Sequence, residues 1–420
     1  MESTEIKIER VIIAGVHTDN INPLLDTTKE SMSELSELVE TAGGEVVGEI
    51  VQNKNVIERG TYFGEGKLEE IRLAGETLEA DMLVIDDELT GAQLRNIEEA
   101  TNLYVIDRNM LILDIFAQRA KSAEGKIQVE LAQLRYNLPR LSGMGKMLSR
   151  QGGGIGTKGP GETKMETDRR HIMRRVEALK EELAEIKKRR DLRRERRKKD
   201  NIKTAAIVGY TNAGKSTLIN ALTGADVVTR NRLFETLDLT SRELILSDSR
   251  PLRIIDTVGF IRRLPHQFIE AFKSTLEEAV EADVILHVVD ASNEQRDDHV
   301  KVTNKLLSEL GCEGKPVVMI YNKVDLLKED YIPSHKAEFE AFISAKSGFN
   351  LDKLKEMIEE ALPDKKKEIT LLIPYTRGDI VSAIHQNELI ISEEYLDDGT
   401  LITALMAEPE RERYKEYAKL

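Results

Sequence analysis

The stretch GYTNAGKS, Gly209 to Ser216, constrains the fold of this chain more than any other part of the sequence. It lies between the apolar run TAAIV and the run TLINALTG, and its last four residues are alanine, glycine, lysine and serine. Glycines let successive backbone N–H groups turn toward one ligand, and the start of a helix attracts anions. The pattern predicts a strand, a phosphate-binding loop and a helix, and therefore an α/β domain.

Three shorter motifs follow, each at the end of a predicted strand. They are DTVG after LRII, NKVD after PVVMIY, and SAK after FEAFI. A carboxylate at Asp256 can hold Mg²⁺ through water, while the amide of Gly259 senses a γ-phosphate. A carboxylate at Asp325 can accept hydrogen bonds from both the N1 and the N2 hydrogens of guanine, which adenine does not offer. This order of motifs indicates a guanine-nucleotide site and disfavours phosphate-loop kinases, which do not use NKVD.

We expect nucleotide contacts from all four motifs. Lys215 is expected to reach the β- and γ-phosphates, and the Ser216 hydroxyl to bind Mg²⁺. The candidate nucleotide-binding residues are Gly209, Tyr210, Thr211, Asn212, Ala213, Gly214, Lys215, Ser216, Thr217, Asp256, Thr257, Val258, Gly259, Asn322, Lys323, Asp325, Ser344, Ala345 and Lys346.

Over residues 201–364 these motifs resemble the GTP-binding domain of the translation-factor-related GTPases. The resemblance implies that Thr236, in FETLDLT, completes the Mg²⁺ shell when GTP is bound, with Thr240 as the alternative. It makes Lys215, Thr236 and Gly259 the candidate catalytic residues. Asn212 resembles the residue with which related GTPases hold K⁺, so K⁺ is a candidate second cofactor beside Mg²⁺.

One residue departs from the Ras-like pattern. Phe260 follows DTVG where a Ras-like enzyme has the glutamine that orients the attacking water. Because an apolar ring cannot hold that water, we expect slow intrinsic hydrolysis and a partner that orders the site. His266 is either a replacement for the glutamine or a surface histidine.

Residues 1–118 alternate apolar strands with amphipathic helices, which predicts a small parallel sheet with helices on its faces. Strands are expected at 11–16, 45–52, 80–87 and 103–107. Helices are expected at 29–44, 64–78 and 90–100, the last with Thr90 as its N-cap. GEGK at 64–67 lacks the following serine or threonine, so we interpret it as a turn and helix start.

Residues 119–200 have a different pattern, with two apolar seams that recur at steps of three and four. Between the seams, eight of the twenty residues from 142 to 161 are glycine, so no helix can continue. We expect an antiparallel coiled-coil hairpin with a glycine-rich tip. The seam residues are Ile127, Leu131, Leu134, Leu138 and Leu141 on the first helix, and Ile172, Val176, Leu179, Leu183 and Ile186 on the second.

The hairpin is basic although the chain is acidic. Residues 119–200 hold 24 lysines and arginines against 12 acidic residues, whereas the whole chain has a net charge of -14. Such asymmetry indicates a polyanion-binding element, with a solvated charged helix as the alternative for residues 187–199. The candidate RNA contacts are Lys146, Arg150, Lys158, Lys164, Arg169, Arg170, Arg174 and Arg175.

The expected fold class is a multidomain α/β chain. Its four parts are an N-terminal α/β domain (1–118), the basic helical hairpin (119–200), a P-loop GTPase domain (201–364) and a small C-terminal α+β domain (365–420). In the last part, DDG at 397–399 predicts a hairpin turn, followed by a charged tail.

The whole chain resembles HflX, a family of ribosome-associated GTPases. The resemblance rests on the order of the parts, on GGGIGTKGPGET followed by Arg169 and Arg170, and on LFETLDLT. It implies binding to the large ribosomal subunit and its rRNA near the peptidyl-transferase centre. It also implies GTP-dependent splitting or rescue of ribosomes, with hydrolysis stimulated by the ribosome.

Two other functions remain open on the sequence alone. One is a GTPase that acts in large-subunit assembly, and the other is an RNA-binding module that uses nucleotide only as a structural ligand. The absence of a signal-like or membrane-length apolar run and the single cysteine, Cys312, lead us to expect a cytoplasmic protein. We also expect the free protein to be a monomer.

Overall fold

The structure is a computed structural model in which two units are distinguished by their residue contacts. The first holds residues 1–197, 229–239 and 258–276, and the second holds 198–228, 240–257 and 277–420. The residues that the structure describes are 8–18, 29–140, 164–199, 202–224, 233–234, 240–247, 250–263, 278–327, 333, 337–363 and 367–419.

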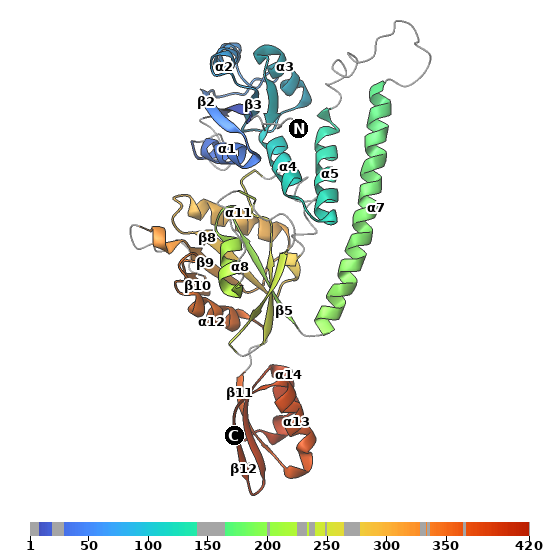
Figure 1. Cartoon of the computed structure of the whole chain (residues 1–420), viewed down its shortest axis with the longest axis vertical. Coiled ribbons are helices and arrows are strands. Elements are labelled where there is room, and N and C mark those ends of the chain that lie inside the picture. The colour runs from blue at the N-terminus through green and yellow to red at the C-terminus, as the bar shows by residue number, and fades with distance from the viewer. Residues whose placement is uncertain are drawn as a thin grey trace, which may run out of the picture. The chain divides into compact units, whose positions relative to one another are not determined.

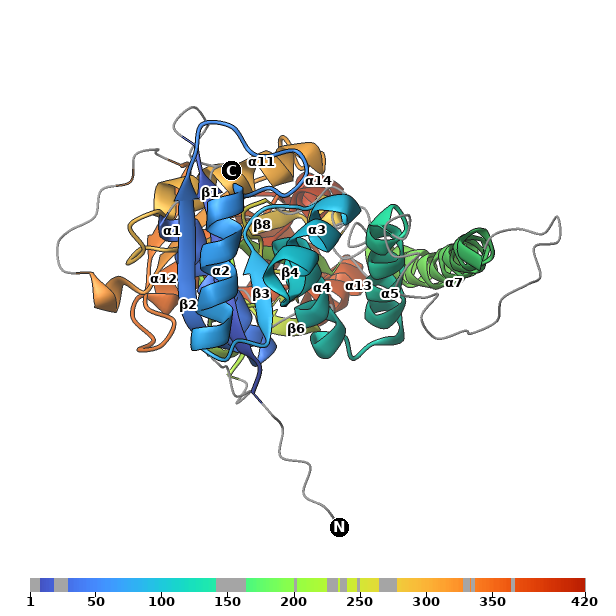
Figure 2. The same ribbon diagram turned by 90° about the horizontal axis from the view of Figure 1, so that it is seen from above.

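The first unit contains a four-stranded parallel sheet in the order β2-β1-β3-β4. Helices α2 and α3 cover one face and α1 and α4 the other (Figures 1 and 2). The expected strands and helices are confirmed, and α4, which the sequence did not predict, follows β4 directly. The elements are β1 (Arg10–His17), α1 (Lys29–Ala42), β2 (Glu45–Asn53), α2 (Glu65–Thr77), β3 (Met82–Ile85), α3 (Gly91–Thr101), β4 (Tyr104–Asp107) and α4 (Arg108–Arg119).

Local signals fix the ends of these elements. The Thr90 hydroxyl accepts a hydrogen bond from the amide of Gln93, and the Gln93 side chain accepts one from the amide of Thr90. This capping box starts α3 at the predicted residue. Gly64 is the N-cap of α2, so GEGK is a turn and helix start, as expected.

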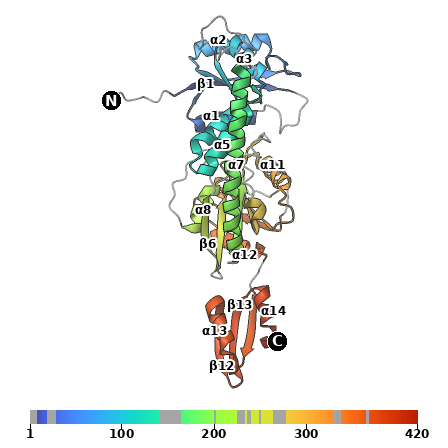
Figure 3. The same ribbon diagram turned by 90° about the vertical axis from the view of Figure 1, so that its right-hand side faces the viewer.

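The helices α5 (Ala123–Asn137) and α7 (Lys164–Lys199) lie side by side in the first unit (Figures 1 and 3). Leu131 of α5 is buried against Val176 and Leu179 of α7, which confirms the predicted seam. Partly buried apolar residues extend it on both helices, namely Ile127, Leu134, Ile172 and Leu183. Leu141 and the glycine-rich tip lie outside the described residues.

The second unit contains a six-stranded sheet in the order β10-β9-β8-β5-β7-β6. All its pairs are parallel except β6 with β7, where Thr240 pairs with Asp256. The apolar runs named in the sequence analysis correspond to β5, β7, β9 and β10, whereas β6 was not predicted. The elements are β5 (Lys203–Gly209), α8 (Lys215–Thr223), β6 (Thr240–Ile245), β7 (Pro251–Asp256), β8 (Val284–Asp290), α11 (Arg296–Glu309), β9 (Val317–Asn322), η3 (Val324–Leu326), β10 (Phe339–Phe342) and α12 (Leu351–Ala361).

The end of the chain forms a three-stranded antiparallel sheet in the order β11-β13-β12. Leu396 pairs with Gly399, so the DDG hairpin turn is confirmed. The expected charged tail instead forms α14 and η5, and Tyr414 packs into the core of this sheet. The elements are β11 (Lys367–Ile373), η4 (Tyr375–Arg377), α13 (Gly378–Asn387), β12 (Leu389–Leu396), β13 (Gly399–Met406), α14 (Glu408–Arg413) and η5 (Lys415–Tyr417).

Two further sequence expectations concern single features. Within the described part of the chain, no helix has both the length and the apolar character that a bilayer crossing demands. Cys312 is buried and forms no disulfide within the chain, and burial raises the pKa of its thiol.

Candidate nucleotide site

The phosphate loop follows β5, next to the point where the strand order of the sheet reverses. Gly209 has φ +151°, and a Cβ there would stand 2.2 Å from the carbonyl oxygen of Val288. Gly214 has φ +92°, and a Cβ there would stand 2.3 Å from Nδ2 of Asn322. Only glycine fits at either position, which is the local reason for the motif. Ligands of open α/β sheets bind at such a reversal.

Lys215 begins α8 and its side chain lies inside the loop. Its Nζ donates to the carbonyl oxygens of Gly209, at 3.1 Å, and Tyr210, at 2.8 Å. Burial lowers the pKa of Lys215 to about 8, although the nearby carboxylate of Asp256 acts in the opposite direction. The loop therefore holds a buried cation at the start of a helix, which favours an anion.

Ser216 and Asp256 lie together at the edge of the loop. The Ser216 hydroxyl donates to the Asp256 carboxylate at 3.3 Å. A hydroxyl and a carboxylate are hard oxygen donors of the kind that Mg²⁺ prefers, so this pair fits the metal expected from the motifs. No group of three or more His, Cys, Asp or Glu side chains suited to a metal was found among the described residues.

Asn322 connects the phosphate loop to the segment after β10. Its side chain donates to the carbonyl of Ala213 at 2.9 Å and accepts a hydrogen bond from the amide of Ala345 at 3.0 Å. NKVD, SAK and the phosphate loop, which are distant in sequence, therefore meet at one side chain. The sequence predicted Asn322 as a site residue but gave no sign of this bridging role.

The rest of NKVD is arranged around its lysine and aspartate. Lys323 has φ +63° and forms an ion pair with Asp290 at 2.7 Å, at the end of β8. Asp325 lies in η3 with its carboxylate exposed. Ser344 and Ala345 are buried, while Lys346 is exposed. An exposed carboxylate beside this loop is available to a base.

The candidate switch residues are described only in part. Thr236 and His266 lie outside the described residues. Thr240, the alternative metal ligand, is the first residue of β6 and pairs directly with Asp256. Val258, Gly259 and Phe260 belong to the first unit and are buried, with 1% of Phe260 exposed. Phe260 is therefore a packing residue, and its effect on hydrolysis stays a prediction.

Two histidines near the loop were not predicted as site residues. The ring of His299, on α11, stacks on Tyr210 with centroids 3.6 Å apart and planes inclined by 5°. Burial, with a contribution from Lys215, lowers the pKa of His287 to about 3. A lone histidine in an apolar strand or on a helix carries no sequence signal for either arrangement.

The candidate RNA-binding residues fall into two groups. Lys146, Arg150 and Lys158 lie outside the described residues, and Lys164 is the first residue of α7. Arg169, Arg170, Arg174 and Arg175 lie exposed along α7. Arg175 forms an ion pair with Glu130 of α5 at 2.7 Å, so this arginine also joins the two helices.

Comparisons with known proteins cover almost the whole chain. Three family models match in succession: "GTP-binding GTPase N-terminal" over residues 29–117, "GTP-binding GTPase Middle Region" over 119–197 and "50S ribosome-binding GTPase" over 204–323. GTPase HflX of Caldanaerobacter subterraneus is 48% identical over 93% of this chain and 90% of its own length. The chain belongs to the GTPase HflX family.

Other HflX proteins match over a similar extent. GTPase HflX of Lacrimispora saccharolytica is 47% identical over 96% of this chain and 95% of its own. That of Escherichia coli is 39% identical over 90% of this chain and 89% of its own. This chain is therefore a GTP hydrolase with a phosphate-loop GTPase domain, as the sequence predicted.

Solved structures of GTP-binding proteins are also similar. A GTP-binding protein of the archaeon Sulfolobus solfataricus, in complex with GDP, matches 83% of this chain and 98% of its own, at 27% identity and a TM-score of 0.44. A structure described as the SsGBP and GDP complex matches 84% of this chain and 98% of its own, at 28% identity and a TM-score of 0.48.

Proposed function

We propose that this chain binds the large ribosomal subunit and the assembled ribosome, and uses GTP to split or rescue ribosomes, with hydrolysis stimulated by the ribosome. The observation that carries the nucleotide half of this proposal is the bridge at Asn322, which places the phosphate loop beside NKVD and SAK. The partner is supported by the matching model of a 50S ribosome-binding GTPase.

Within this proposal the nucleotide is held from both ends. Backbone amides of residues 209–216 and the Lys215 ammonium bind the phosphates, and the Asp325 carboxylate accepts hydrogen bonds from guanine. Ser216 and Thr236 would hold Mg²⁺, with Asp256 acting through water, and the metal would supply neutralisation of the phosphate charge. We further propose that Asn212, which has φ +61°, holds K⁺.

The basic hairpin is the proposed contact with rRNA. RNA binding relies on neutralising phosphates, and the exposed arginines of α7 present such charge along one rigid helix. The glycine-rich tip carries Lys158 among residues that allow close approach of the backbone. The four-part division at residues 118, 200 and 364, a cytoplasmic location and a monomeric free state belong to the same proposal.

Sedimentation tests the ribosome half of the proposal. We expect the protein to sediment with the large subunit in the presence of a non-hydrolysable GTP analogue, and less with GDP. Exchanging Lys158 and Lys164 for glutamate should weaken this binding and leave the affinity for GTP intact. Lys180→Glu is the matched control, because Lys180 lies on the same helix and pairs with Glu177. Equal losses in both variants would contradict a specific tip contact.

Guanine recognition is tested separately with Asp325→Asn. We expect this variant to lose affinity for GTP and GDP, because an amide cannot accept from both hydrogens of the guanine edge. Equilibrium binding of GTP, GDP and ATP to both proteins measures the change. An unchanged affinity for GTP would remove Asp325 from the site.

A second function in the same class is large-subunit assembly, which the same 50S-binding model would also fit. Light scattering of assembled ribosomes with the protein and GTP separates the two. A fall in scattering supports splitting. Constant scattering together with hydrolysis accelerated by large subunits supports assembly.

A further inference from the structure

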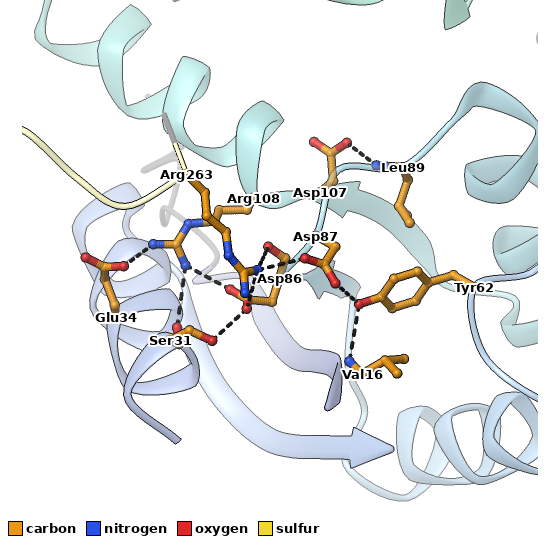
Figure 4. A network of polar contacts seen from close by, with 10 residues as sticks. All are labelled: Val16, Ser31, Glu34, Tyr62, Asp86, Asp87, Leu89, Asp107, Arg108 and Arg263. Carbon is orange, nitrogen blue, oxygen red and sulfur yellow. Dashed lines mark hydrogen bonds and ion pairs between the residues drawn. The ribbon is translucent and has the colours of Figure 1, made fainter. Parts of the chain in front are cut away.

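A single arginine after the DTVG motif reaches a pair of carboxylates in the N-terminal sheet. Arg263 lies in residues 258–276, which the contacts assign to the first unit. Its Nη1 contacts the Asp87 carboxylate at 2.7 Å and the Asp86 carboxylate at 3.0 Å (Figure 4). It also donates to the Asp86 carbonyl at 3.3 Å. One guanidinium therefore holds both residues of the turn after β3.

The two carboxylates are themselves fixed by N-terminal residues. Asp86 is fully buried, and it pairs with Arg108 at 2.8 Å and accepts from the Ser31 hydroxyl at 2.7 Å. Asp87 accepts from the Tyr62 hydroxyl (Figure 4). Burial alone would raise the pKa of Asp86, but Arg108 and Arg263 hold it below its usual value. Arg263 thus meets a rigid, charged partner, which orders a flexible side chain at lower entropic cost.

The backbone at this contact is held in an unusual conformation. Arg263 has φ +54°, in the left-handed region that costs a non-glycine residue energy. Phe234, in the other segment assigned to the first unit, has φ +52° and packs edge to face on Phe116 of α4 at 4.7 Å. Such conformations persist only where surrounding contacts determine them. Each segment is therefore anchored on the N-terminal domain.

We propose that Arg263 is a positioning residue that anchors the segment after DTVG to the Asp86–Asp87 turn and thereby prepares Gly259 to contact the γ-phosphate. This inference rests on the proposed role of Gly259. Gly259 lies four residues before Arg263, which is within about 14 Å along the chain. An anchored segment loses less conformational freedom when GTP binds. GDP has no γ-phosphate, so the benefit applies to GTP alone.

The test compares two dissociation constants in the full-length protein without ribosomes. In Arg263→Gln we expect the affinity for a non-hydrolysable GTP analogue to fall about three- to tenfold, with the affinity for GDP unchanged within about twofold. Arg263→Lys keeps the charge and should restore part of the loss. A purely structural defect would lower the affinities for both nucleotides together, and this result would overturn the proposal. An unchanged affinity for the analogue would also overturn it.

A double-mutant cycle identifies the partner. Asp87→Asn should give a similar selective loss, and the double variant should lose no more than either single one. Arg72→Gln is the matched control, since Arg72 also pairs with two carboxylates of the N-terminal domain, Glu69 and Glu76. Additive losses at Arg263 and Asp87, or a selective loss in the control, would overturn the proposal.

Gly259→Ala separates failure of the anchor from failure of the proposed function. We expect this variant to lower the affinity for the non-hydrolysable GTP analogue and to leave the affinity for GDP unchanged. If Gly259→Ala leaves the ratio of the two affinities unchanged, the γ-phosphate contact itself is wrong and the anchor proposal is overturned with it. If Gly259→Ala is selective and Arg263→Gln is not, only the anchor is wrong.

Discussion

The side chain of Asn322 donates a hydrogen bond to the carbonyl oxygen of Ala213 at 2.9 Å, which joins the end of β9 to the phosphate loop. Both atoms are buried, so loss of the donor leaves an unsatisfied carbonyl. The contact makes the shape of the phosphate loop depend on the base-recognition motif.

Asn322→Ala should therefore weaken the binding of both GTP and GDP by about tenfold, because it removes two buried hydrogen bonds, one to Ala213 of the phosphate loop and one from the amide of Ala345. Fluorescence titration with a labelled guanine nucleotide measures the effect. Asn387→Ala is a suitable control, since Asn387 makes a single exposed bond of the same length to Ala383. Equal affinities in the wild type and Asn322→Ala would contradict the bridging role.

Gly209→Ala should abolish nucleotide binding or lower the free energy of unfolding by about 3 kcal/mol or more, because the new Cβ meets the Val288 carbonyl. Gly224→Ala separates this clash from backbone strain, since Gly224 has φ +66° with open space around it. That variant should cost only about 1 kcal/mol. Chemical denaturation measures both, and similar costs would show that strain alone matters at Gly209.

Nucleotide binding should take up protons in mildly alkaline solution. Because the pKa of Lys215 is lowered to about 8, half of the Lys215 side chains are deprotonated at pH 8 in the nucleotide-free protein. Bound phosphate favours the ammonium form. We expect an uptake of about half a proton per nucleotide at pH 8 and about one-tenth at pH 7. Calorimetric titration in two buffers of different ionisation enthalpy measures it. No increase from pH 7 to pH 8 would contradict the lowered pKa.

The helical hairpin should be stabilised by its apolar seam more than by its ion pairs. Leu179→Ala removes a fully buried side chain and should cost about 2–5 kcal/mol. Leu192→Ala, on the same helix but with 61% of the residue exposed, should cost little. Arg175→Ala breaks an exposed ion pair and should cost much less than Leu179→Ala. Thermal unfolding of the three variants gives the order, and a larger loss at Arg175 than at Leu179 would contradict it.

The nucleotide loop and most strands could be predicted because their signals are local. Gly209 and Gly214 mark positions that only glycine can occupy, and the apolar runs of β5 and β9 are long enough to identify buried strands. The seam around Leu179 follows from spacing along one helix. In each case a few consecutive residues carry the physical cause.

The remaining features depend on residues that are distant in sequence. Arg263 and Asp86 are 177 positions apart, and no local pattern distinguishes this arginine from its neighbour Arg262. β6 forms by pairing with β7 and lies at the edge of the sheet, so its sequence alternates weakly. α4 begins at the residue after β4, which leaves no loop to signal a new helix.

The pairing of Thr240 with Asp256 has a mechanical consequence. The segment before β6 and the segment after β7 leave the sheet from this one pair of residues, and both segments are assigned to the first unit. A displacement of either segment therefore acts on the same backbone pair. One member of this pair is Asp256, whose carboxylate is proposed to hold the metal. The two segments that hold the predicted switch residues Thr236 and Gly259 start from one shared position of the sheet, so we expect a change in one to reach the other through that pair.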